Sequence, residues 1–219
     1  MKNTIFLIAA VLFALNISCK KEPAEETSYP TDGLVSYFNF DNNLIDDLGN
    51  TPEGTNHGSA VFSEGKAGQA ITLNGSGQYI EFGRNTYRSG NNISVSVWIK
   101  RSSNAGLYAI MCNDFGIWAT NTTAGMAISV PLTESAAGPL TPNEWTHLVG
   151  TYDGTDIKAY VNGILLETNN HPGVIADWVG NLKLGVFDTD YWAGSIDELF
   201  IYGKVLSQSE VDQLYNYHL

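Results

Sequence analysis

The chain has 219 residues, 43% of them hydrophobic, and 23 Asp and Glu against 11 Lys and Arg give a formal net charge of -12. This length and composition favour one large domain with a substantial core, and the acidity argues against nucleic-acid binding because phosphates would be repelled. Gly is frequent, with 22 residues, and only 16% of residues are charged. That balance favours strands and turns over long helices, whose exposed faces usually carry Lys and Glu.

The N-terminus predicts export. Lys2 precedes an apolar run over 5–15 that is too short for a comfortable membrane span, and a small residue closes the segment. This is the pattern of a secretory signal peptide, here residues 1–18. Cys19 resembles the lipidated cysteine of a bacterial lipobox, although Asn16 stands where Leu is usual. Ordinary cleavage nearby, with Cys19 left as a free thiol, is the alternative.

Residues 20–30 are polar, acidic and contain Pro, so we expect residues 19–32 to form a flexible tether after the lipidated cysteine. The composition resembles the acidic stretch that follows the lipidated cysteine in surface-exposed lipoproteins of Bacteroidetes-type bacteria. We therefore expect an exported protein of the cell envelope, held through Cys19 at a membrane, with the outer membrane as the predicted one.

From Gly33 onward, short apolar runs separated by turns predict β-strands. The expected strands are 34–40, 60–62, 70–73, 79–82, 93–99, 108–112, 115–118, 145–152, 156–161, 164–167, 182–186 and 195–202. Asp153-Gly154 and Asn162-Gly163 are hairpin signals, so 145–167 is expected to form a three-stranded antiparallel meander. This strand spacing without intervening helices predicts an all-β, two-sheet sandwich over residues 33–219.

One short helix is expected at the C-terminus. The segment from Ser207 to Glu210 has the form of a capping box, in which the Ser hydroxyl and the Glu carboxylate each pair with the other residue's backbone amide. Val211, Leu214 and Tyr215 then form an apolar stripe that we expect to dock on the sandwich; a partner-binding role for the stripe is the alternative.

Several segments carry a family resemblance. They include 33–41, 93–100, Trp145–Gly154 (WTHLVGTYDG), Ala193–Tyr202 (AGSIDELFIY) and 206–210. Their order and spacing resemble the laminin-G-like branch of the concanavalin A-like lectin/glucanase superfamily. The resemblance implies an antiparallel jelly-roll sandwich with a short C-terminal helix. It does not settle function, because this fold hosts lectins, adhesins, hydrolases and lyases.

No catalytic centre is expected. Jelly-roll glucanases of the laminarinase type carry Glu-x-Asp-x-x-Glu on one strand, and Ser195 and Phe200 stand where the two glutamates would be. Strand alternation would also send Asp197 and Glu198 to opposite faces. We therefore predict that the protein is not an enzyme, with a polysaccharide hydrolase or lyase as the alternative.

The resemblance also implies one structural Ca²⁺ near the chain ends, where the first and last strands are commonly neighbours. Asp41, Asn43 and Asp46 follow the first strand and Asp197 lies on the last, so their oxygens are the expected ligands. Turn chemistry is the alternative, because Asp and Asn also cap their own backbone in loops.

Glycan binding requires exposed aromatic rings that stack on sugars, with carboxylates or amides that hold hydroxyls. The expected ligand-binding residues are Trp118, Trp178, Asp188, Asp190 and Tyr191. Packing in the interior is the alternative for each aromatic. The predicted function is non-catalytic, surface-anchored recognition of a glycan; the remaining alternative is an adhesion or structural domain that binds a cell-surface protein.

Overall fold

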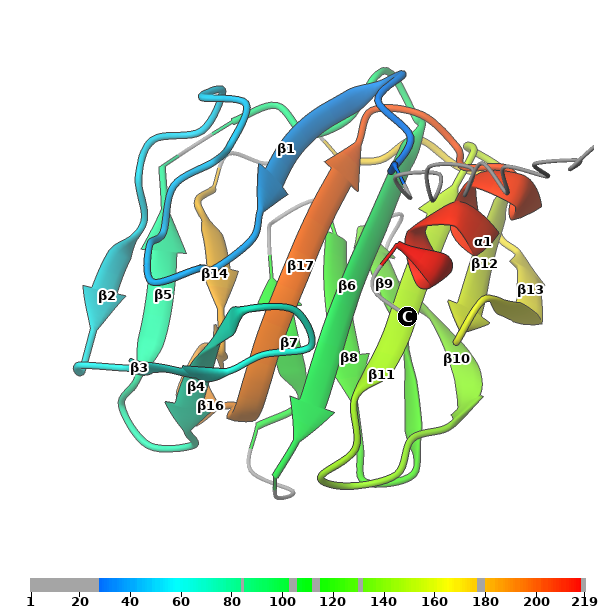
Figure 1. Ribbon diagram of the computed structural model, residues 1–219. Helices are drawn as coiled ribbons and strands as arrows, with labels where there is room; N and C mark the ends of the chain where they lie inside the picture. Colours follow the sequence, from blue (N-terminus) through cyan, green and yellow to red (C-terminus); the bar gives the residue numbers. More distant parts are fainter. Residues whose placement is uncertain are drawn as a thin grey trace, which may run out of the picture.

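The computed structural model describes residues 28–83, 85–102, 106–111, 115–129, 132–176 and 180–217. The predicted signal peptide, Cys19 and Trp178 lie outside the described residues. Within them, no helix has the length and apolar character needed to cross a membrane. Two antiparallel sheets stack face to face, and a single described helix lies outside them (Figure 1).

The elements follow one another as β1 (Leu34–Phe38), β2 (Thr55–His57), β3 (Val61–Glu64), β4 (Gln69–Asn74), β5 (Tyr79–Phe82), β6 (Ile93–Arg101), β7 (Tyr108–Met111), β8 (Phe115–Ala119), β9 (Thr123–Ser129), β10 (Leu132–Pro139), β11 (Thr146–Tyr152), β12 (Asp156–Val161), β13 (Ile164–Asn170), β14 (Leu182–Leu184), β15 (Val186–Phe187), β16 (Asp190–Tyr191), β17 (Ala193–Tyr202) and α1 (Gln208–Asn216).

The strands form an eight-stranded and a seven-stranded sheet. The first has the order β13-β12-β11-β6-β17-β4-β3, with β1 also paired to β17. The second has the order β10-β9-β8-β7-β14-β5-β2, and β15 and β16 form a separate hairpin. The predicted jelly-roll sandwich is confirmed, as are the β11–β13 meander and the pairing of the first strand with the last.

The core lies between the two sheets and follows from strand alternation. In β6, Ile93, Val95, Val97 and Ile99 are all fully buried and belong to one core cluster. Burying each such side chain contributes about 1.5–3 kcal/mol, so these four hold the central strand firmly. Trp98 points to the opposite face, where α1 covers it through a stacked contact with Tyr215.

Sequence patterns did not predict β2, β9, β10 or β16. Strands β9 (TAGMAIS) and β10 (LTESAAGP) are rich in Ala, Gly and Pro, which have low strand propensity. They form because β9 pairs with both β8 and β10. Pairing with neighbouring strands overrides weak local preference here.

Strand β17 corrects the expectation for Asp197 and Glu198. Its register to β6 shifts between Asp197 and Phe200, and Glu198 has a positive φ of 51°. The extra residue of this β-bulge brings Asp197 and Glu198 to the same outer face, whereas Leu199 enters the core. The prediction of opposite faces was wrong because alternation holds only in an unbroken strand.

Helix α1 begins at the predicted capping box. The Ser207 side chain accepts a hydrogen bond from the Glu210 amide, and the Glu210 carboxylate accepts one from the Ser207 amide. Val211 and Leu214 are buried in a cluster on the outer face of the eight-stranded sheet. The predicted docking of the helix on the sandwich is therefore confirmed.

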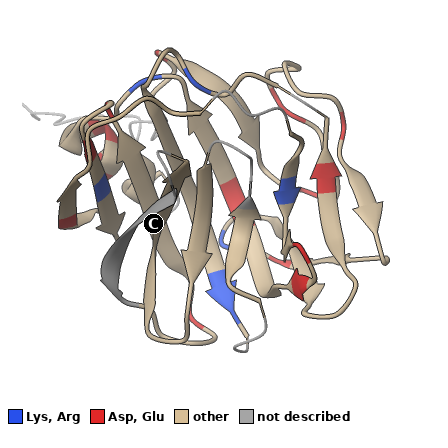
Figure 2. Cartoon of the chain, turned by 180° about the vertical axis from the view of Figure 1, so that it is seen from behind, with Lys and Arg blue, Asp and Glu red and all other residues tan. Residues whose placement is uncertain are grey.

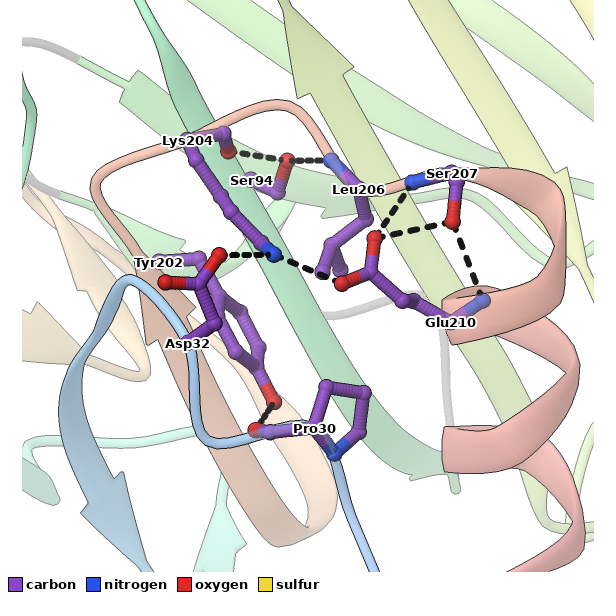
Figure 3. Close-up of polar contacts among 8 residues, drawn as sticks. All are labelled: Pro30, Asp32, Ser94, Tyr202, Lys204, Leu206, Ser207 and Glu210. Atoms are coloured by element: carbon purple, nitrogen blue, oxygen red, sulfur yellow. Dashed lines mark hydrogen bonds and ion pairs between the residues drawn. The ribbon is translucent and has the colours of Figure 1, made fainter.

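The folded domain starts before Gly33, so the predicted tether boundary at residue 32 needs correction. The Pro30 carbonyl accepts a hydrogen bond from Tyr202 at 2.9 Å, and Lys204 bridges Asp32 and Glu210 at 2.8 and 2.6 Å (Figure 3). Tyr29 packs against Phe200 with ring centroids 5.1 Å apart. Residues 28–32 thus join the C-terminal helix to the sheet instead of forming the end of a tether.

Candidate functional site

The outer face of the seven-stranded sheet carries an accessible group of rings and charges at its β2–β5–β14 end. Strand register places His57 opposite Tyr79, and Lys183 opposite Glu81. Tyr191, on the β15–β16 hairpin, lies 6.5 Å from Tyr79 between ring centroids. We call His57, Tyr79, Glu81, Lys183 and Tyr191 the Tyr79 patch. Figure 2 views this side of the molecule, where most of the strand surface carries no charge.

Local sequence explains why these side chains point outward. In β5, Ile80 and Phe82 are fully buried in the core, so Tyr79 and Glu81 occupy the opposite face. In β14, the leucines on either side of Lys183 are likewise buried, which turns the lysine outward. The same alternation that builds the core therefore builds the patch.

Glu81 is the electrostatic centre of the patch. Its Oε1 accepts a hydrogen bond from Asn181 at 3.0 Å and lies 3.6 Å from the Lys183 ammonium, and its Oε2 lies 3.5 Å from His57 Nε2. The Asn181 hydrogen bond, with help from Lys183 and His57, lowers the pKa of Glu81 below its ordinary value. Glu81 is therefore a fixed carboxylate, able to accept hydrogen bonds from hydroxyl groups.

The rings of the patch form a partly exposed aromatic surface. His57 and Tyr79 stack with centroids 4.3 Å apart and planes 8° apart, and Lys183 Nζ lies 5.9 Å from the Tyr79 ring centre. Phe187, in the same hairpin as Tyr191, is 43% exposed. Aromatic faces beside a carboxylate, an ammonium and an amide can hold a sugar ring, whose two sides are apolar and whose edge is polar.

The structure brings some of the predicted ligand-binding residues together and separates others. Tyr191 belongs to the patch, and Asp188 and Asp190 are exposed on its hairpin. Trp118 is only 6% exposed and packs against Tyr108 and Ala127, so it is not an exposed stacking platform. The interior alternative therefore describes Trp118 better.

Sequence reasoning missed His57, Tyr79, Glu81 and Lys183. Alternation within 79–82 and 182–184 would have shown that these residues share the outward faces of their strands. The pairing of β5 with both β2 and β14, which assembles them, spans residues far apart in the chain and leaves no local signal.

Two of the four predicted metal ligands converge on one loop. Asp41 Oδ1 accepts a hydrogen bond from the Gln69 amide, and Asp197 Oδ2 accepts from the amides of Lys66 and Ala67, at 2.7, 2.7 and 3.1 Å. A Cβ added to Gly65 would lie 2.4 Å from the Ala67 carbonyl oxygen and 2.6 Å from Asp197 Oδ2. One carboxylate oxygen of Asp197 and the Ala67 carbonyl oxygen therefore lie near Gly65, and both are ligand types that Ca²⁺ accepts.

The other two predicted ligands do not fit a metal. The buried Asp46 carboxylate accepts hydrogen bonds from the four backbone amides of Tyr37, Leu48, Asn50 and Thr51. Asn43 bonds to the backbone of its own loop. Both follow the turn-chemistry alternative. Across the described ranges no three His, Cys, Asp or Glu side chains cluster, so a metal at Asp41 and Asp197 would need backbone oxygens.

The positions compared with a glucanase motif have structural partners. The Ser195 hydroxyl lies 2.8 Å from the Thr72 hydroxyl, and Phe200 stacks on Tyr37 with centroids 4.1 Å apart. Nearby, buried His147 shares a 2.8 Å hydrogen bond with Ser96, and burial lowers the pKa of His147 to about 3. These groups pack on the outer face of the eight-stranded sheet.

Comparison with known proteins agrees with this architecture. The family model described as concanavalin A-like lectin/glucanases superfamily matches residues 74–212. Domain 4 of AbnA, a GH43 extracellular arabinanase from Geobacillus stearothermophilus, solved in complex with arabinotriose, is 27% identical, with a TM-score of 0.71 over 84% of this chain and 98% of that domain. No curated protein matches the sequence.

Botulinum neurotoxin structures share the fold. The type C structure, whose description states that cell entry depends on two ganglioside molecules, is 17% identical with a TM-score of 0.71 over 86% of this chain. The DC binding domain in complex with SialylT is also 17% identical, with a TM-score of 0.69. The chain spans about half, 52%, of each toxin chain. At such identity the likeness concerns the fold alone.

Proposed function

The chain belongs to the concanavalin A-like lectin/glucanases superfamily, and from this premise we propose that it is a non-catalytic recognition module that binds glycan through the Tyr79 patch. The observation that carries the proposal is the stacked His57–Tyr79 pair beside the Glu81 carboxylate on an accessible sheet face. Domain 4 of AbnA, solved with arabinotriose and similar over its whole length, supports the ligand class.

The patch has the parts that sugar binding needs. Tyr79 and Tyr191 are tilted by 42° to each other, which gives two differently oriented ring surfaces for successive sugar units. Glu81 and Asn181 offer an acceptor and an amide for hydroxyls at the sugar edge. Stacking rings and hydrogen-bonding groups of this kind orient a bound sugar, which is what a recognition module requires.

A titration with arabino-oligosaccharides tests this function. Tyr79→Ala and Tyr191→Ala should each abolish detectable binding, because stacking contributes much of the affinity of a small ligand. Tyr215→Ala is the matched control: Tyr215 is a partly buried tyrosine on α1 and should leave binding unchanged. Binding that survives Tyr79→Ala, or no neutral glycan bound by the wild type, would contradict the proposal.

The proposed setting is the cell envelope, with the domain held at the outer membrane by lipid on Cys19. Residues 28–32 pack on the outer face of the eight-stranded sheet, so the chain enters the domain there. This entry point lies on the side opposite the Tyr79 patch, so the patch would face away from an anchoring membrane. Cys19→Ala should release the protein from the membrane fraction; retention in that fraction would count against lipidation.

We also propose that Asp41 and Asp197 hold a structural Ca²⁺ with carbonyl oxygens of the 65–68 loop. Burial raises the pKa of Asp197 to about 8, so a cation there would relieve the cost of its charge. Bound Ca²⁺ would raise the melting temperature by favouring the folded state. A melt unchanged between saturating EDTA and Ca²⁺ would exclude this site.

A further inference from the structure

The charges around the Tyr79 patch are predominantly negative. The register places Lys183 on the patch, and its ammonium lies 3.6 Å from Glu81 Oε1. Asp188 and Asp190 are exposed on the hairpin that carries Tyr191. Lys183, Glu81, Asp188 and Asp190 contribute one positive and three negative formal charges, a sum of -2, and the sum stays negative at -1 when a charge on His57 is added.

The positive charge of Lys183 is also largely compensated. Its nearest acidic partner, Glu81, stays ionised because Asn181, Lys183 and His57 all lower its pKa. An incoming carboxylate or sulfate group would therefore compete with Glu81 for the same ammonium. It would also meet the charges of the two aspartates on the Tyr191 hairpin, which are exposed to solvent and screened over about 8 Å at physiological ionic strength.

We infer that the Tyr79 patch selects uncharged glycans and rejects polyanionic ones; this inference rests on the proposed glycan-binding function. Sugar hydroxyls can donate hydrogen bonds to Glu81, Asp188 and Asp190, and bonds to ionised acceptors are stronger than bonds between neutral groups. An acidic sugar would gain no such bond from its own carboxylate. The net charge of -12 on the whole chain also repels polyanionic ligands.

The test compares a neutral arabino-oligosaccharide with an oligogalacturonide of equal length. The wild type should bind the neutral chain at least about tenfold more tightly, a difference of about 1.4 kcal/mol, and added salt should narrow the gap. The double variant Asp188→Asn with Asp190→Asn should strengthen oligogalacturonide binding several-fold and change neutral binding little. Asn suits position 188, where φ is 54°, because it tolerates the left-handed region.

A second double variant separates local from overall charge. Glu64→Gln with Asp212→Asn removes the same formal charge from β3 and α1, away from the patch, and should change neither affinity. Two results would contradict selection against acidic glycans while leaving glycan binding intact. One is equal wild-type affinity for both glycans, and the other is an equal gain in oligogalacturonide affinity in the two double variants. Binding of neither glycan would overturn the proposed function and this inference together.

Discussion

The outer face of the eight-stranded sheet is covered by α1 and by residues 28–32, whereas the outer face of the seven-stranded sheet keeps rings and charges within reach of solvent (Figures 1 and 2). On the covered face, Tyr37 donates a 2.7 Å hydrogen bond to Glu198, and His147 is buried beside Ser96. On the open face, Lys183 remains 42% exposed and Tyr79 half-buried.

The difference between the faces separates stability from recognition. Tyr37, Glu198, Ser96 and His147 on the covered face form hydrogen bonds inside the protein, so changes to them should act on the free energy of unfolding. Side chains of the Tyr79 patch could be removed with little loss of packing, so changes there should act on binding.

Phe200→Ala should lower the free energy of unfolding by about 3–5 kcal/mol, the usual cost of removing a buried aromatic ring. Phe200 is buried, stacks on Tyr37 and contacts Tyr29. Phe187→Ala, on the open side, is the matched control and should cost less than about 1.5 kcal/mol because 43% of the residue is already exposed. Denaturant unfolding of both variants measures the difference. Equal losses in the free energy of unfolding would contradict the distinction between the two faces.

His147 should make the domain sensitive to acid. Its folded-state pKa of about 3 lies below the ordinary value of 6.5. Between these two pH values, His147 is therefore protonated in the unfolded chain but neutral in the folded one. Stability should therefore fall as the pH drops below about 6.5, by up to about 1.4 kcal/mol per pH unit. Unfolding midpoints across this range, compared with His147→Gln, give the slope. An unchanged slope in the variant would show that His147 is not its source.

Asp197 should act in the opposite direction when Ca²⁺ is removed. Its folded-state pKa of about 8 lies above the ordinary 3.8, so its contribution to stability is present below pH 4 and is lost as the pH rises toward 8. Within this window the slope should reach up to about 1.4 kcal/mol per pH unit, as for His147 but with the opposite sign.

The Asp197 slope is measured as the melting temperature in EDTA across this pH range. Asp197→Asn should flatten the slope, and excess Ca²⁺ should do the same in the wild type. The His147 contribution is first subtracted. If stability then still falls as the pH falls in this window, the predicted sign of the Asp197 effect is wrong.

Tyr79→Ala should have the smallest effect on folding, under about 1 kcal/mol, because the ring lies on an open sheet face. The remaining β5 residues Ile80 and Phe82 keep the strand in the core. Thermal unfolding of the variant beside the wild type measures this. A loss comparable to that of Phe200→Ala would identify Tyr79 as a structural residue.

Sequence reasoning recovered the fold because most strands carry their own signal. Strand 79–82 and strand 156–161 were predicted to the residue, and the capping box located α1. The bulge at Glu198 and strands β9 and β10 depend on neighbouring strands, so local patterns could not show them. The site was recovered only in part: Tyr191 was found, but the patch depends on pairing between β2, β5 and β14.

The most direct test of the open face as the binding surface is a backbone amide NMR titration of the isotope-labelled domain with a neutral arabino-oligosaccharide. We expect chemical-shift changes centred on β2, β5, β14 and the β15–β16 hairpin, and no changes in residues 28–32 or α1. Changes centred on α1, on residues 28–32 or on the 65–68 loop would contradict it.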